Sequence, residues 1–401
     1  MTEHLFSDLK VVDCGSYIAA PAAATMLGDF GADVVKIEPP HSGDVYRRLP
    51  KLPGNPRGDD NYAWTLDARN KRSLALDLRN PSAQEVLHRL AAQADVFITN
   101  YPLKSRERFG FPYETLAAGN PRLIYASFTG YGETGKEAHK PGYDVTAWWA
   151  RSGMMDVARA HATDTPVRPT VGMGDHPAAI SLFAAILIAL YRRQQTGTGT
   201  YVSSSLLANG IWANSYMAQA ALLGATMVPR PPRVEALNAL SSYYKCSDGR
   251  WLILTMLNEE RDWPILARCL GLADLIDNPR FATRKDRHAN SVALVAELDV
   301  AFGSKDRDIW QRALHEHGLV FEVVAAVEEI PNDQQLVDNG IVIPTADGVT
   351  MTVSGPLDVQ GAPKVTPRRP PDIGEHTDEV LAEVGYDVAA IKALHTNGAV
   401  A

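Results

Sequence analysis

One aspartate, Asp175, stands between a glycine-containing turn and a long apolar segment at residues 178–191. Pro177 suits the first turn of a helix, where its missing N–H group is not needed, so we expect a helix to begin here. The helix dipole would favour the ionised carboxylate, and Gly172 and Gly174 would let a ligand approach closely. An ionised, accessible carboxylate can attack an activated acyl group. The alternative is that Asp175 serves only as an N-cap.

Basic residues form three further groups that could bind an anion. They are Arg47-Arg48, the segment Asn-Lys-Arg-Ser at residues 70–73, and Lys104 with Arg106 and Arg108. All three are expected near one edge of a sheet, where ammonium and guanidinium groups could hold a polyanion such as a nucleotide diphosphate. For any single group, a solvated surface is the more common explanation.

The first expected strand–helix turn argues against a nicotinamide dinucleotide. Residues 14–21 contain one glycine where the dinucleotide fingerprint needs three. Tyr17 would obstruct a pyrophosphate, and Glu38 alone is a weak sign of ribose binding. The sequence also contains no P-loop, no H-E-x-x-H or G-x-S-x-G motif, and no Cys/His cluster with metal-ligand spacing. We therefore set NAD and metal chemistry aside.

Alternating strand and helix patterns must position these residues. Residues 9–13 and 32–37 are typical of buried strands on either side of a helix at 21–29, a βαβ unit of the dinucleotide-fold type. Further strands are expected at 73–78, 95–99 and 123–127, and a further helix at 82–93. This alternation predicts an α/β fold with an open, mostly parallel sheet.

The length of 401 residues favours two domains. A proline-rich stretch at 228–232 marks a boundary. We expect residues 1–227 to form the first part of a large domain, 228–330 a small α+β domain, and 331–401 a return to the large domain. Hairpins are expected at 243–255 and 341–353, and later helices at 262–270, 290–302, 306–315 and 377–384.

Composition indicates a soluble, cytoplasmic protein. The net charge of −8 argues against nucleic acid or an anionic membrane as a partner. The three cysteines, Cys14, Cys246 and Cys269, form no disulfide framework, and residues 1–9 do not resemble a signal peptide. Residues 200–229 contain no charge but many polar side chains. We interpret them as a long helix buried between subunits rather than as a membrane span.

Several segments, in this order and spacing, resemble the family III CoA-transferases, a superfamily that includes the carnitine, bile-acid and formyl-CoA transferases and the α-methylacyl-CoA racemases. The resemblance covers residues 9 to about 394. It is carried by residues 27–38 (LGDFGADVVKIE), 70–73 (NKRS), 130–132 (GYG), 141–144 (PGYD), 192–199 (RRQQTGTG) and 374–381 (GEHTDEVL).

The resemblance implies that Asp175 is a nucleophile that forms an aspartyl anhydride with the acyl group and then an aspartyl-CoA thioester. It implies an acyl-CoA and a small carboxylic acid as substrates, no permanently bound cofactor, and an interlocked homodimer. Residues at positions matching the reacting centre are Tyr143, Asp144 and Ile18. Residues at positions matching CoA contacts are Ala19, Leu76, Asp77, Leu78, Asn100, Arg108 and Lys140, and the large domain would therefore bind CoA.

Departures from the family pattern keep some points open. Pro39 replaces an arginine that contacts CoA in the formyl-CoA enzyme, so His41 or Arg47 would take the adenine side. Ile18 replaces that enzyme's glutamine, and its glycine-rich lid is absent from 238–263, so formate and oxalate are poor candidates. A racemase and a non-catalytic CoA-binding subunit are the alternatives. The racemases have a histidine where Tyr143 stands, and tyrosine is a poor proton acceptor at neutral pH.

Overall fold

The computed structural model describes residues 4–401, which divide into two compact units. The first unit holds the chain up to Met155, together with Arg168–Leu223 and Gln334–Ala401. The second holds Asp156–Val167 and Gly224–Asp333. The chain thus leaves the first unit and returns to it, so this unit combines segments that are far apart in the sequence.

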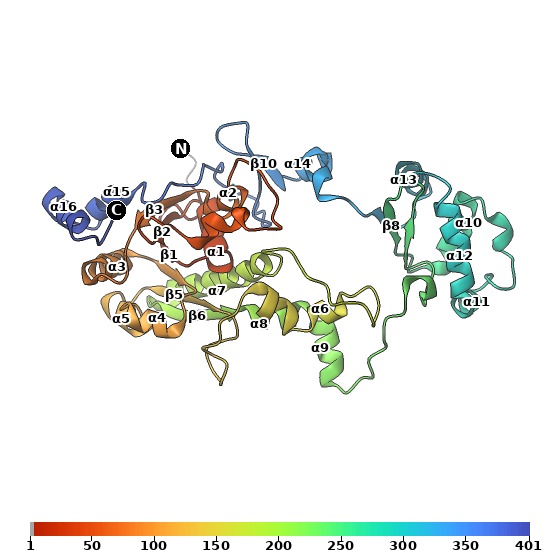
Figure 1. Ribbon diagram of the computed structural model, residues 1–401, viewed down its shortest axis with the longest axis horizontal. Helices are drawn as coiled ribbons and strands as arrows, with labels where there is room; N and C mark the ends of the chain where they lie inside the picture. Colours follow the sequence, from red (N-terminus) through yellow and green to blue (C-terminus); the bar gives the residue numbers. More distant parts are fainter. Residues whose placement is uncertain (1–3) are drawn as a thin grey trace. The chain divides into compact units, whose positions relative to one another are not determined.

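A six-stranded sheet lies at the centre of the first unit, in the order β3-β2-β1-β4-β5-β6 (Figure 1). Its strands are β1 (Lys10–Cys14), β2 (Asp33–Glu38), β3 (Lys71–Ala75), β4 (Val96–Thr99), β5 (Ile124–Thr129) and β6 (Thr200–Ser205). Every neighbouring pair is parallel, which confirms the expected open parallel sheet. The order reverses between β1 and β4, and ligands of such sheets bind outside the carboxyl ends of the strands at this switch point.

Helices cover both faces of the sheet. On one face α1 (Ala19–Asp29) and α7 (Asp175–Thr196) pack against the strands and against each other (Figure 1). The core of the other face includes side chains of α3 (Pro81–Gln93), α5 (Tyr113–Gly119) and α15 (Thr377–Glu383). All eleven residues of α1 are buried, and five of them are alanines. These small side chains let α7 approach closely enough to bring its first turn to the switch point.

Helix α7 alone, among the helices of residues 4–401, has the length and apolar composition that would also suit a membrane span. Its buried side chains, among them Leu182, Phe183 and Ile186, belong to the core against the sheet.

Shorter elements complete the first unit. They are the 3₁₀ helix η1 (Val45–Lys51), the π-helical η2 (Asp144–Ala150), helices α2 (Tyr62–Ala68), α4 (Leu103–Arg108), α8 (Leu206–Ala213), α9 (Ser215–Leu222), α14 (Gln334–Asp338) and α16 (Val388–Thr396), and the antiparallel pair β10 (Val342–Pro344) and β11 (Met351–Val353). Helix α6 (Met154–Val157) lies where the chain passes to the second unit.

The prediction of one long helix at residues 200–229 is wrong. The segment begins with the edge strand β6 and continues as the two short helices α8 and α9. Ser203, Ser204 and Ser205 pair with β5 as strand residues, and the Ser205 side chain then caps α8. The uncharged run therefore combines a strand and two helices, not one hydrophobic span.

The second unit is a smaller α+β structure. Its antiparallel sheet joins β7 (Tyr243–Lys245), β8 (Trp251–Leu254) and β9 (Phe321–Val323). Its helices are α10 (Glu259–Cys269), α11 (Arg284–Ala289), α12 (Ser291–Phe302) and α13 (Arg307–Glu316), with 3₁₀ turns η3 (Arg233–Glu235), η4 (Ala273–Leu275) and η5 (Val327–Asn332). Its core includes Trp263, Phe302 and Trp310 together with Leu252 and Leu254 of β8, which confirms the expected α+β module.

Candidate active site

A cavity of about 610 Å³ opens at the carboxyl ends of the central strands. Its wall is formed largely by the segments that follow β1, β2, β4 and β5, and by Asp175 at the start of α7. These segments are residues 15–19, 42–45, 100–103, 128–130 and 138–145. The cavity therefore occupies the switch-point crevice where a parallel sheet of this order binds its ligands.

Asp175 is the first residue of α7, and Gly174 is the N-cap. No side chain caps this helix, so the interpretation of Asp175 as an N-cap is wrong. Burial raises the pKa of Asp175 from 3.8 to about 7, the nearby Asp144 carboxylate adds to the rise, and His176 opposes it. A Cβ at Gly174 would lie 2.8 Å from the Trp148 ring, so the turn before Asp175 requires glycine.

Asp144 of η2 organises this turn. It is the first residue of η2, and its Oδ2 accepts hydrogen bonds from the backbone N–H groups of Gly172 (3.2 Å) and Gly174 (3.4 Å). The Asp144 side chain thus fixes the backbone that presents Asp175. It also places a second carboxylate beside Asp175, and this charge raises the pKa of Asp175.

Two tyrosines form an aromatic part of the cavity wall. The rings of Tyr17 and Tyr143 meet edge to face with their centroids 5.6 Å apart, next to the buried Ile18. Tyr17 has a φ of +61°, a left-handed conformation that is rare for a bulky residue. Such a conformation persists only where surrounding contacts impose it.

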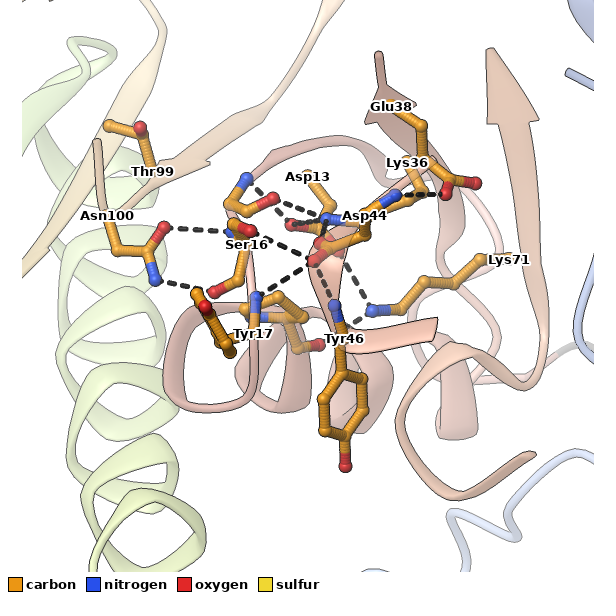
Figure 2. Close-up of polar contacts among 12 residues, drawn as sticks. Asp13, Ser16, Tyr17, Lys36, Glu38, Asp44, Tyr46, Lys71, Thr99 and Asn100 are labelled. Carbon is orange, nitrogen blue, oxygen red and sulfur yellow. Dashed lines mark hydrogen bonds and ion pairs between the residues drawn. The ribbon is translucent and has the colours of Figure 1, made fainter. Parts of the chain in front are cut away.

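Asp44 supplies several of these contacts, as Figure 2 shows. Its Oδ1 accepts from the Ser16 hydroxyl (2.9 Å), the Tyr17 N–H (3.2 Å) and the N–H of Tyr46 (2.9 Å). Its Oδ2 forms a buried ion pair with the Nζ of Lys36 at 2.9 Å. The Asp44 carboxylate therefore holds the turn after β1 in the shape that presents Tyr17 and Ile18 to the cavity.

Asn100 holds the same turn from β4 (Figure 2). Its side-chain oxygen accepts from the Ser16 N–H at 2.9 Å, and its Nδ2 donates to the Ser16 carbonyl at 2.7 Å. Deeper in the unit, Lys71 donates to Asp13 Oδ2 (2.9 Å) and to the Pro21 carbonyl (2.7 Å). Buried ion pairs therefore lie next to the loop that faces the cavity.

The structure brings most of the expected site residues to this cavity. They are Ile18, Ala19, Asn100, Lys140, Tyr143, Asp144 and Asp175. Arg47 does not line it, because its guanidinium pairs with both oxygens of Glu38 at 2.7 Å and stacks on Trp64. Its neighbour Arg48 lines the cavity instead.

Leu76, Asp77, Leu78 and Arg108 also lie outside the cavity wall. Leu76 is buried and bridges to Val400, and Asp77 is paired with its neighbour Arg79. The Arg108 guanidinium lies over the Phe109 ring. CoA contacts of these four residues remain predictions.

The basic segment at residues 70–73 is not open to a ligand. Arg72 pairs with Asp33, Glu379 and Glu383, and Lys71 is buried on Asp13. On the cavity wall the basic side chains are instead Arg48, His139 and Lys140. The positioning role of Asp44 was missed because it depends on contacts between segments that are distant in the sequence.

Comparisons with known proteins agree with this fold. Residues 6–377 match the family described as CoA-transferase family III. The chain is 34% identical over 397 residues to the (R)-2-hydroxy-4-methylpentanoate CoA-transferase of Clostridioides difficile, which covers 96% of both chains. It is 31% identical over 400 residues to the cinnamoyl-CoA:phenyllactate CoA-transferase of Clostridium sporogenes, and the match covers 98% of this chain and 96% of that relative. A CAIB/BAIF family protein from Brucella suis superposes with a TM-score of 0.85 at 30% identity, and the match covers 94% of this chain and 98% of the Brucella chain.

Proposed function

The chain belongs to CoA-transferase family III, enzymes that move CoA from an acyl-CoA to a carboxylate, and from that premise we propose that Asp175 is the nucleophile of the transfer. The observation that supports this most strongly is the position of its carboxylate. Asp175 lies on the cavity wall, at a helix start, without a capping hydrogen bond. A carboxylate held there is free to attack the thioester of a bound acyl-CoA.

The proposed reaction uses the carboxylate as nucleophile and as leaving group in turn. An Asp175 oxygen attacks the thioester carbon and breaks the C–S bond, which gives an aspartyl–acyl anhydride and CoA thiolate. The thiolate attacks the aspartyl carbonyl, which releases the donor acid and leaves an aspartyl-CoA thioester. The acceptor carboxylate then attacks this thioester, and the thiolate moves to the acceptor's carbonyl in the second anhydride. A new acyl-CoA and free Asp175 result, with no net change in protons or electrons.

The cavity wall provides two conditions that these steps need. An anhydride must be kept from water, and the buried side chains of Ile18 and Leu206 form apolar parts of the wall near Asp175. The tyrosines Tyr17 and Tyr143 carry hydroxyl groups, which can donate hydrogen bonds to a developing oxyanion. Arg48 and Lys140 are suited to the CoA phosphates.

We further propose that the substrates include a 2-hydroxycarboxylic acid with an apolar side chain. The names of both relatives contain such an acid. The edge-to-face pair Tyr17–Tyr143 with Ile18 offers an apolar surface for its side chain. A panel of acceptor acids tested with acetyl-CoA and succinyl-CoA checks this, and a preference for oxalate or formate would contradict it.

An interlocked cytoplasmic homodimer is also part of the proposal. Trp212, Tyr216, Leu222 and Leu223 on and beside α8 and α9 are each more than three-quarters exposed in the single chain. Soluble proteins seldom leave so large an apolar group in water, so we expect the second subunit to cover it. Light scattering at low concentration tests this, and a stable, active monomer would contradict it.

Trapping tests the nucleophile directly. Hydroxylamine added during turnover should convert the activated Asp175 into a hydroxamate, which peptide mass spectrometry detects. The Asp175→Ala variant should lose transfer, whereas near wild-type transfer by this variant would exclude the mechanism.

A further inference from the structure

His176, the residue after Asp175, occupies a built site of its own. Its Nδ1 lies 3.1 Å from the Gly172 carbonyl oxygen. Its Nε2 lies 3.1 Å and 3.3 Å from the two carboxylate oxygens of Asp67 on α2. Asp67 is almost fully buried, and its Oδ2 also accepts from the Tyr46 hydroxyl at 2.5 Å.

The two partners of the imidazole determine its protonation state. A backbone carbonyl and a carboxylate are both acceptors, so each ring nitrogen must donate. A neutral imidazole carries only one N–H, and only the imidazolium carries two. The pKa of His176 points the same way: burial lowers it, but the hydrogen bond and the charge of Asp67 outweigh burial and raise it above 6.5.

Gly172 gives the ring its place. The φ of Gly172 is +83°, and a Cβ added there would lie 3.0 Å from His176 Nδ1 and 3.1 Å from its Cε1. The turn that Asp144 holds is therefore also shaped around the imidazole. Because both ring nitrogens are engaged, His176 cannot exchange a proton with a substrate while this arrangement lasts.

We propose that His176, fixed between Asp67 and the Gly172 carbonyl, is a lasting imidazolium whose charge favours the ionised form of the Asp175 carboxylate. The inference rests on the proposed role of Asp175 as nucleophile. His176 is a positioning residue, since it acts through Asp175 and not on the substrate. Asp67 in turn holds the ring, and the Tyr46 hydroxyl donates to Asp67.

The charges around Asp175 explain why a cation is needed there. The ionisable groups on the neighbouring elements and on the cavity wall are Asp144 on η2 and Tyr143 just before it, Asp67 on α2, Tyr46 on η1, Tyr17 and Asp44 near β1 and β2, and Arg48, His139 and Lys140. The carboxylates of Asp144 and Asp67 both raise the pKa of Asp175, and His176 lowers it. Without that cation, the pKa of Asp175 would rise above its value of about 7.

Replacing His176 with glutamine removes the charge and keeps a polar side chain. An opposite charge within about 4–6 Å shifts a carboxyl pKa by one to three units, and we take about one unit for this partly exposed ring. The acidic limb of the kcat/KM profile should then move up by about one unit. The rate should fall about fivefold at pH 7 and less than twofold at pH 9. An unmoved limb would overturn the proposal.

Tyr46→Phe is the matched control. It removes one hydrogen bond to Asp67 but changes no charge at neutral pH, since burial and Asp67 raise the pKa of the Tyr46 hydroxyl far above its usual value. Its acidic limb should stay within a few tenths of a unit of wild type. A shift as large as that of His176→Gln would mean that the limb reports packing, and would contradict the proposal.

Nitrogen-15 NMR of the histidine rings gives a readout that needs no turnover. His176 should show two protonated ring nitrogens at pH 7 in the wild type, and its pKa should be lower in Asp67→Asn, which removes the carboxylate charge that raises it. A singly protonated ring in the wild type would overturn the proposal. Hydroxylamine trapping on His176→Gln at pH 9 distinguishes a failure of the proposed role of His176 from a failure of the proposed nucleophile, Asp175. A labelled Asp175 with an unmoved acidic limb refutes the role of His176 alone, whereas an unlabelled Asp175 in the wild type refutes the nucleophile.

Discussion

Replacing Asp175 with asparagine should stabilise the first unit, and the gain should grow with pH. Folding raises the pKa of this carboxyl from 3.8 to about 7, through burial first and the Asp144 charge second. In the unfolded chain Asp175 ionises near pH 4, whereas in the folded chain it ionises near pH 7. The wild type therefore keeps its full stability below about pH 4 and loses part of it as pH rises to about 7, where the folded form also ionises. Asparagine cannot ionise and avoids this loss.

The size of the effect follows from the pKa difference. About three units at 1.36 kcal/mol each give a gain of up to about 4 kcal/mol at pH 8, and almost none at pH 4. Urea unfolding read by hydrogen exchange on peptides from α1 and β4 follows the first unit separately from the second. The gain would show that the fold gives up stability to keep a carboxylate buried at this position.

Asp347→Asn is a control of opposite sign. Hydrogen bonds from the N–H groups of Val349 and Thr350 lower the pKa of Asp347. The wild type should therefore lose the stability of this group as pH falls, and the asparagine variant should be the less stable one at neutral pH. A difference for Asp175→Asn that is flat from pH 4 to 8, or that follows the slope of the control, would refute the reasoning.

Three further outcomes are expected. Asp144→Asn removes a charge that raises the pKa of Asp175, so the acidic limb of the kcat/KM profile should move down by about one pH unit. An upward shift, as expected for His176→Gln, would contradict this prediction. Gly174→Ala places a Cβ 2.8 Å from the Trp148 ring and should cost about 1–3 kcal/mol in urea unfolding and most of the transfer activity; a variant of wild-type stability and rate would show that the turn is not tightly packed. A 2-methylacyl-CoA incubated in deuterated water without an acceptor acid should take up little deuterium, because Tyr143 replaces the racemase histidine and both nitrogens of His176 are bonded; rapid uptake would favour the racemase alternative.

The buried strands could be predicted from the sequence because a parallel strand covered on both faces is a continuous apolar run. Val11 and Val12 face opposite cores, and both are buried. The start of α7 was also predictable, since Pro177 and the two glycines mark it locally. The helices α2 and α4 were missed, because six or seven residues make too few turns to show a helical period.

The positioning residues were missed for a different reason. Asp67 meets His176 across 109 positions of the sequence, and Asp44 meets Tyr17 across 27. No local pattern records such pairs, because they depend on how α2 and η1 pack beside the switch point. The contacts of Arg47 could not be predicted for the same reason, since nothing near it in sequence shows that Glu38 and Trp64 engage its guanidinium.

The central claim is that Asp175 carries the acyl group and then CoA during transfer. The most direct measurement is peptide mass spectrometry after hydroxylamine is added to the enzyme turning over an acyl-CoA and an acceptor acid. We expect a hydroxamate on Asp175 that requires the acyl-CoA, and none on Asp144. Full transfer activity with an unmodified Asp175, or modification of another carboxylate in its place, would contradict the claim.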